Sequence, residues 1–99
     1  IEKMHKAPFG YDIWQIKDDY KLWKKYSAFP SELASRCIQC FTNENDSILD
    51  PYAGTGTTIF VSNLLKRHGL GYEIDSSLKS VYAEREIEIN KSMNKLELF

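Results

Sequence analysis

The hydrophobic and polar positions of this 99-residue chain follow two periods, one typical of strands and the other of helices. Strands are predicted at residues 11–16, 47–50 and 70–74, where apolar residues alternate with polar ones or form a short run. Helices are predicted at residues 30–40, 57–68 and 76–95, where apolar residues recur at helical spacing. Strands that alternate with helices in this order predict an α/β fold with parallel strands and right-handed connections.

Residues at the ends of these segments support the helix boundaries. Pro30 suits the first position of a helix, because an N–H group there would lack a partner anyway. Gly69 follows the second helical segment, as glycine commonly does at a helix C-terminus. Asp75 and Ser76 can cap the last helix. One face of that helix carries Leu78, Tyr82, Arg85, Ile89, Met93 and Leu96.

A glycine-rich turn joins the strand at residues 47–50 to the helix that follows it. Gly54 and Gly56 have no Cβ atom, so the chain can bend sharply and a ligand can approach the backbone. The N–H groups at the start of the helix would face that ligand. Asp50 and Glu73 lie at the predicted carboxyl ends of neighbouring strands, the edge at which such sheets bind ligands. The turn and the two acids therefore predict one binding site.

Three classes of ligand use a turn of this kind, and the residues favour one of them. A triphosphate-binding loop needs a lysine after its last glycine, but Gly56 is followed by Thr57. A dinucleotide site needs a third glycine, and this chain has Ile59 there. A nucleoside with a charged amino-acid tail needs an acid such as Asp50 for its ammonium group. It needs a second acid for its ribose hydroxyls, a role that fits Glu73. Taken singly, these residues would form only a turn, a helix cap and a solvated strand end.

Residues 50–58, with the sequence DPYAGTGTT, resemble the D-P-F-x-G-S-G-T-T cofactor motif of the DNA amino-methyltransferases. Residues 13–16, 29–33 and 71–74 resemble the D-V-W-x-I strand, the F-P-x-x-L helix start and the G-x-E strand of that family. Members of the family use S-adenosylmethionine to methylate the N6 of adenine or the N4 of cytosine. The resemblance implies that the cofactor-binding residues are Phe29, Pro30, Asp50, Tyr52, Gly54, Gly56, Thr57 and Glu73.

The resemblance extends from about residue 11 to residue 90 and implies a partial Rossmann-like methyltransferase fold, three-layered with parallel strands. We expect residues 1–99 to form one partial domain, with a strand and loop at 11–28 and the cofactor-binding core at 29–95. The catalytic tetrapeptide of the family, D-P-P-Y or S-P-P-Y, does not occur in the sequence, so no catalytic residue is assigned. The chain therefore resembles the C-terminal half of a permuted enzyme.

This interpretation makes function depend on a second component. A missing N-terminal half or a partner chain would carry the tetrapeptide, and the complete enzyme would act on double-stranded DNA, in a restriction-modification system. The present chain alone would be inactive, and a dimer is compatible with this scheme. Two alternatives stay open: a non-catalytic module that binds the cofactor or a partner, and a small-molecule or RNA methyltransferase that shares the turn.

Composition and charge add few constraints. No apolar run is long enough to cross a bilayer, so a cytoplasmic chain without membrane association is expected. The formal net charge of −1 does not indicate a polyanion partner. Lys21, Lys24 and Lys25 interleave with aromatic residues, which fits either contact with a phosphate backbone or a solvated loop. Cys37 and Cys40 are expected to be reduced thiols on a helix, one inward and one outward, rather than a metal or redox site.

Overall fold

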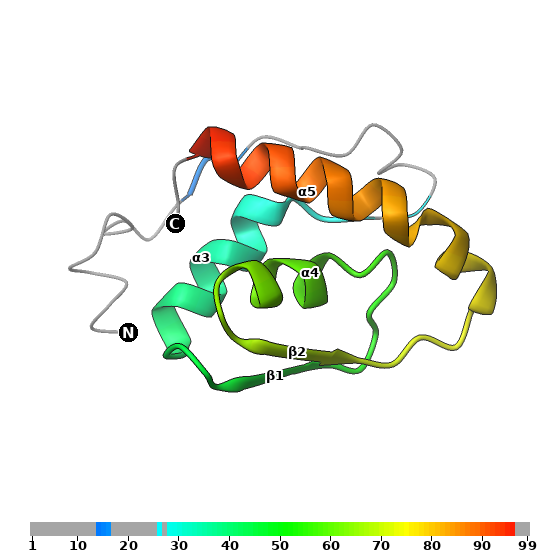
Figure 1. Cartoon of the computed structure of the whole chain (residues 1–99), viewed down its shortest axis with the longest axis horizontal. Coiled ribbons are helices and arrows are strands. Elements are labelled where there is room, and N and C mark those ends of the chain that lie inside the picture. The colour runs from blue at the N-terminus through cyan, green and yellow to red at the C-terminus, as the bar shows by residue number, and fades with distance from the viewer. Residues whose placement is uncertain (1–13, 17–25, 27, 97–99) are drawn as a thin grey trace.

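The computed structural model describes residues 14–16, 26 and 28–96, and their fold is α/β (Figure 1). The elements are, in chain order, α3 (Ser31–Phe41), β1 (Ser47–Asp50), α4 (Thr57–Leu64), β2 (His68–Gly71), the 3-10 helix η1 (Ser76–Val81) and α5 (Tyr82–Leu96). The two strands pair in parallel, in a register that runs from Ser47 opposite His68 to Asp50 opposite Gly71. The predicted α/β fold with parallel strands is confirmed.

The helices of the described residues gather on one side of the sheet. α4 contacts both strands, and α3 and α5 pack against α4 and against each other (Figure 1). The core between them consists of Ala34, Ile38, Val61, Leu65, Ile89 and Met93, with Ile48 of β1 packed against it. Leu49 and Leu70, which face each other in the register, are 61% and 59% exposed. The described residues therefore supply the sheet and one helical side of the three-layer arrangement, and leave the other face of the sheet bare.

The first helix and the first strand lie where the sequence predicts them. α3 begins one residue after Pro30, which stands at the N-cap with its carbonyl accepting from the N–H groups of Leu33 and Ala34. Its buried side includes Ile38 and Cys40, whereas Cys37 is exposed, so the predicted inward and outward thiols are confirmed. β1 occupies residues 47–50 as predicted, with Ile48 turned toward the core.

The second helix and the second strand differ from the prediction. α4 ends at Leu64 instead of continuing to residue 68, and β2 spans 68–71 instead of 70–74. The chain reverses at Lys66, which adopts a left-handed φ of 65°. Gly69 is consequently not a helix cap but a strand residue. A Cβ atom there would lie 2.8 Å from the carbonyl oxygen of Ile59, so the glycine lets α4 pack directly on β2.

The predicted strand at residues 11–16 is wrong for its described part, because residues 14–16 form no strand. The ring of Trp14 instead lies beneath the guanidinium group of Arg36 on α3, with 5.4 Å between the guanidinium carbon and the ring centroid. This contact directs the segment toward a helix rather than toward the sheet. The rest of that predicted strand, and the lysines at positions 21, 24 and 25, lie outside the described residues.

The C-terminal helix forms with the predicted cap. The carboxylate of Asp75 accepts a hydrogen bond of 3.0 Å from the N–H of Ser77, and the first six residues after it form η1 before α5 begins. Arg85, Ile89 and Met93 of α5 are fully buried, as members of the predicted inner face. No helix in the part of the chain that the structure describes is long and apolar enough to span a membrane.

Candidate functional site

The glycine turn after β1 is fixed by backbone geometry and by bonds to the chain beyond β2. Gly54 and Gly56 have φ values of 55° and 87°, which residues other than glycine rarely adopt. A Cβ atom on Gly56 would also lie 2.8 Å from the ring of Phe60. The N–H of Ala53 donates to the carbonyl of Tyr72 over 2.9 Å, which ties the turn to the segment that follows β2.

The carboxylate of Glu73 lies directly beside this turn. Its Oε1 accepts a hydrogen bond of 2.8 Å from the N–H of Gly54, and its Oε2 accepts one of 2.9 Å from the N–H of Asp75. An ionised carboxylate offers about four acceptor positions on its two oxygens. The half-buried Glu73 is therefore held in place from two sides while each oxygen keeps capacity for a further donor.

Asp50 ends β1 on the same edge of the sheet. Its Oδ1 accepts a hydrogen bond of 2.9 Å from the N–H of Tyr52, and its carbonyl accepts from the N–H of Tyr72 over 3.0 Å. Its register partner Gly71 ends β2, two residues before Glu73. The two predicted acids thus lie at the ends of adjoining parallel strands, as their sequence positions indicate.

Large apolar side chains surround this edge and are open to solvent. Tyr52, in the turn, is 87% exposed, and Ile74, directly after Glu73, is fully exposed. Exposed apolar side chains beside a polar site offer a surface on which a flat ring can lie. Ile74 is not among the site residues predicted from the sequence, although a large apolar residue next to an acid at a strand end was a usable signal.

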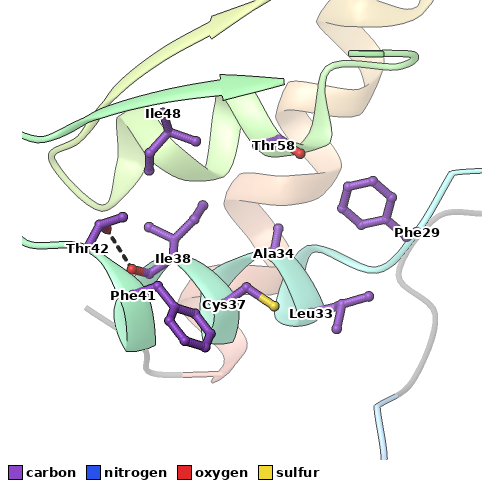
Figure 2. A pocket seen from close by; sticks show the side chains of 9 residues that line it. All are labelled: Phe29, Leu33, Ala34, Cys37, Ile38, Phe41, Thr42, Ile48 and Thr58. Atoms are coloured by element: carbon purple, nitrogen blue, oxygen red, sulfur yellow. Dashed lines mark hydrogen bonds between the residues drawn. The ribbon is translucent and has the colours of Figure 1, made fainter. Parts of the chain in front are cut away.

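The segment before α3 lies near the start of α4, because Phe29 and Thr58 line the same groove. Phe29 is 38% exposed and lines an open apolar groove of about 430 Å³. Figure 2 shows the side chains of α3 along one wall of this groove, Ile48 and Thr58 along the other, and Phe29 at one end. Phe29 and the first turn of α4 therefore line the same groove.

Cys37 of α3 also lines the groove, and its surroundings affect its acidity. Partial burial raises the pKa of the Cys37 thiol, and the neighbouring Cys40 raises it further. A thiol with a raised pKa is protonated at neutral pH and is a weak nucleophile or metal ligand. The described residues hold no cluster of three potential metal ligands.

A buried arginine of the last helix, which was not predicted as a site residue, connects two of the predicted site residues. The Nε of Arg85 donates to the hydroxyl oxygen of Thr57 over 3.1 Å, and its Nη2 donates to the carbonyl of Phe29 over 2.9 Å. Thr57 is the first residue of α4, and its hydroxyl lies 3.4 Å from that of Thr55. The sequence offered no signal that the arginine reaches these partners, which are 28 and 56 residues away.

The arrangement combines three features that suit one kind of ligand. The start of α4 supplies backbone N–H groups and the positive end of a helix dipole, which favour a negatively charged group. Asp50 and Glu73 supply acceptors for an ammonium group and for hydroxyls, and the exposed Tyr52 and Ile74 supply apolar surface. A nucleoside that carries both an ammonium and a carboxylate group matches this set of partners.

A family model described as DNA methylase, of the N6/N4 methyltransferase type, matches residues 3–84 of the chain. The Type II methyltransferase M.MjaI of Methanocaldococcus jannaschii is 42% identical over 77 residues, which cover 74% of this chain and 25% of that protein. M.MthZI of Methanothermobacter thermautotrophicus is 37% identical over 92 residues, covering 86% of this chain and 26% of that protein.

One solved structure with a similar fold is a DNA modification methylase from Thermus thermophilus, complexed with S-adenosyl-L-methionine. The two structures superpose with a TM-score of 0.57 at 36% sequence identity, over 64% of this chain and 26% of the other. The chain thus spans about a quarter of the length of each of these three proteins.

Proposed function

Because the chain belongs to the N6/N4 DNA methylase family, we propose that it is the S-adenosylmethionine-binding portion of a site-specific DNA methyltransferase. The target would be the N6 of adenine or the N4 of cytosine. The observation that carries this proposal is the position of Glu73, whose carboxylate the Gly54 N–H holds beside the glycine turn at 2.8 Å. A carboxylate fixed there, with acceptor capacity left, suits a ribose diol.

The remaining site residues would each contact a different part of the cofactor. Asp50 would accept from the ammonium group, and the N–H groups at the start of α4 would receive the carboxylate of the methionine part. Tyr52 and Ile74 would border the adenine ring, since both side chains are exposed beside Glu73. The Phe29–Pro30 segment and Thr57 would close over the methionine end.

Methyl transfer would require a second component, and the described residues offer a surface to which such a component could bind. A parallel sheet is normally covered on both faces, but Leu49 and Leu70 are about 60% exposed on the bare face. Burying the exposed part of each leucine would contribute about 1–2 kcal/mol. We propose that residues 1–99 form a partial domain that the rest of the enzyme completes by covering this face and the apolar groove beside α3.

The completed enzyme would transfer the methyl group directly. The target base would leave the duplex, and its exocyclic nitrogen would attack the methyl carbon as the bond between that carbon and the sulfonium sulfur breaks. The methylated nitrogen would then release a proton to the other component or to solvent. The other component would bring the D-P-P-Y or S-P-P-Y tetrapeptide, which holds the target amine. This chain would hold the methyl donor in position for the transfer. By itself it would bind the cofactor without methylating DNA.

The setting follows from the same proposal. M.MjaI and M.MthZI are Type II methyltransferases, so we place the completed enzyme in a restriction-modification system that methylates double-stranded DNA. Such a system would act in the cytoplasm, where its DNA lies.

Calorimetric titration with S-adenosylmethionine tests the site. The chain should bind the cofactor, and Glu73→Ala should weaken binding about tenfold or more, because a charged hydrogen-bonding partner is lost. Glu84→Ala is the matched control, since Glu84 is an exposed acid on α5. Equal affinity of the wild-type chain and Glu73→Ala would show that Glu73 is not part of the site. A folded wild-type chain that does not bind would refute the proposal that S-adenosylmethionine is its ligand.

A mixing experiment tests the need for a second component. Radioactive methyl transfer to double-stranded DNA should appear when the chain is combined with a fragment that carries the tetrapeptide, and should be absent with either piece alone. If both pieces are folded and the mixture stays inactive, the split-enzyme proposal fails. The chain would then be better explained as a non-catalytic binding module.

A further inference from the structure

Arg85 occupies a position where its helix otherwise buries apolar side chains. It lies in the first turns of α5, and the following members of its face, Ile89 and Met93, belong to the core. All three side chains are fully buried. A guanidinium group keeps its charge inside a protein, so burying it is costly unless hydrogen bonds compensate. The position of this cation therefore calls for an explanation beyond packing.

The contacts of Arg85 connect three separate parts of the chain. Its Nε donates to the hydroxyl of Thr57 at 3.1 Å and its Nη2 to the carbonyl of Phe29 at 2.9 Å. Its Nη1 lies 3.8 Å from the carboxylate of Glu88, one turn further along α5. One rigid, planar group thus joins α5, the start of α4 and the residue before Pro30.

The two hydrogen-bond partners belong to two of the segments that are predicted to hold the cofactor. Thr57 is the first residue of α4, directly after Gly56, and Phe29 belongs to the segment that lies at one end of the groove (Figure 2). Because a guanidinium group presents its N–H donors in a fixed fork, its two bonds fix the spacing between the two acceptors. A lysine, with one ammonium nitrogen, cannot reproduce this spacing.

We propose that Arg85 is a positioning residue of the cofactor site, which fixes the Phe29–Pro30 segment relative to the start of α4. This inference rests on the proposed function, because the object that it positions is the S-adenosylmethionine site. Arg85 is fully buried and acts through Phe29 and Thr57 rather than by touching the cofactor.

The test compares cofactor affinity with stability in the 99-residue chain. Arg85→Lys and Arg85→Met should each weaken S-adenosylmethionine binding about tenfold or more, measured by calorimetry at a temperature where circular dichroism shows a folded chain. Ile89→Val is the matched control, because it shortens a buried side chain on the same face of α5 without touching either acceptor. It should lower the thermal midpoint and leave the affinity unchanged.

Two substitutions at Thr57 give a second route that does not depend on the folding of the Arg85 variants. Thr57→Ser keeps the hydroxyl that accepts from Arg85, so it should lose less affinity than Thr57→Val. Thr57→Val has a similar shape but no acceptor, so it should weaken binding, and adding Arg85→Lys to it should cost little more. A stable Thr57→Val chain with wild-type affinity would overturn the inference.

The outcomes separate this inference from the function on which it rests. If the wild-type chain binds and a folded Arg85→Met chain binds equally well, the positioning role is refuted and the cofactor site stands. If Ile89→Val weakens binding as much as Arg85→Met at the same loss of thermal midpoint, affinity follows stability and the positioning role is also refuted. A folded wild-type chain that does not bind would refute the function and the inference together.

Discussion

The backbone N–H of Gly54 and the carboxylate of Glu73 are joined by a hydrogen bond of 2.8 Å across 19 residues of sequence. The bond connects the turn after β1 with the segment after β2, so the two halves of the candidate site are held together before any ligand binds. A preformed site of this kind binds its ligand with less loss of conformational entropy.

Removing the charge of Glu73 while keeping its shape separates the effect of the charge from that of the hydrogen bond that it accepts from Gly54. Glu73→Gln keeps a carbonyl oxygen that can accept from Gly54, but it loses one acceptor oxygen and the negative charge. Because the side-chain NH2 would face the Asp75 N–H, which donates to Oε2 in the wild-type chain, we expect the free energy of unfolding to fall by about 1 kcal/mol. S-adenosylmethionine binding should weaken by about tenfold. Calorimetry on this variant and on Glu84→Gln, an exposed site on α5, measures the difference. Unchanged affinity in Glu73→Gln would mean that the charge has no part in binding.

Alanine substitutions at the two glycines of the turn should lower the free energy of unfolding by different amounts. Gly54 has a φ of 55° and an added Cβ would meet nothing closer than 4.0 Å, so Gly54→Ala should lose about 1–2 kcal/mol from backbone strain. Gly56 has a φ of 87° and the ring of Phe60 lies 2.8 Å from the position of an added Cβ, so Gly56→Ala should lose more. Urea unfolding of both variants measures this order. A smaller loss for Gly56→Ala than for Gly54→Ala would contradict the geometry of the turn.

The cap of the C-terminal helix should make stability depend on pH in acid. Hydrogen bonds from the side chain and backbone of Ser77 lower the pKa of Asp75. A carboxyl group with a lowered pKa in the folded state stabilises the fold above its unfolded pKa, and this contribution disappears as the pH falls below about 4. The stability difference between the wild-type chain and Asp75→Ala should therefore be larger at about pH 7 than at about pH 3. Thermal unfolding at both pH values measures it, and an equal difference would refute the role of the ionised cap.

The two thiols of α3 should report on the groove. Cys40 is 4% exposed and should not react in the folded chain, whereas the exposed Cys37 should be alkylated slowly at neutral pH and faster as the pH rises. The slow reaction follows from its raised pKa, because only the thiolate is the nucleophile. Mass spectrometry of iodoacetamide-treated protein measures this, with Cys37→Ser as the control that should take up no label.

The same label tests where the second component binds. If the rest of the enzyme covers the groove, its presence should protect Cys37 from alkylation, because Cys37 lines the groove. Equal labelling of Cys37 in the free chain and in an active mixture would show that the groove stays open and that the interface lies elsewhere.

Local signals in the sequence predicted the elements whose ends are set by neighbouring residues. The helix after Pro30 and the cap at Asp75 depend on contacts within a few positions, and both agree with the structure. The strand at residues 47–50 also lies where it was predicted, although its ladder partners are in β2. The order of strands and helices also sufficed to place Asp50 and Glu73 on one edge of a parallel sheet.

The errors arose where packing between distant residues decides the structure. Gly69 looks like a helix cap in the sequence, but it is needed in β2 because the backbone of Ile59 lies against it. Lys66, which carries no turn signal, makes the reversal. The sequence did not predict the bonds of Arg85 to Phe29 and Thr57, because they join residues far apart in the chain.

The most direct test of the account is a titration of the isotope-labelled chain with S-adenosylmethionine, followed by proton–nitrogen correlation spectra. The account predicts that the amide signals of Gly54, Gly56 and Glu73 move together with one dissociation constant, and that signals from the middle of α5 stay in place. Signals that move elsewhere while those three stay fixed would contradict the central claim, which is that the glycine turn and Glu73 form the binding site.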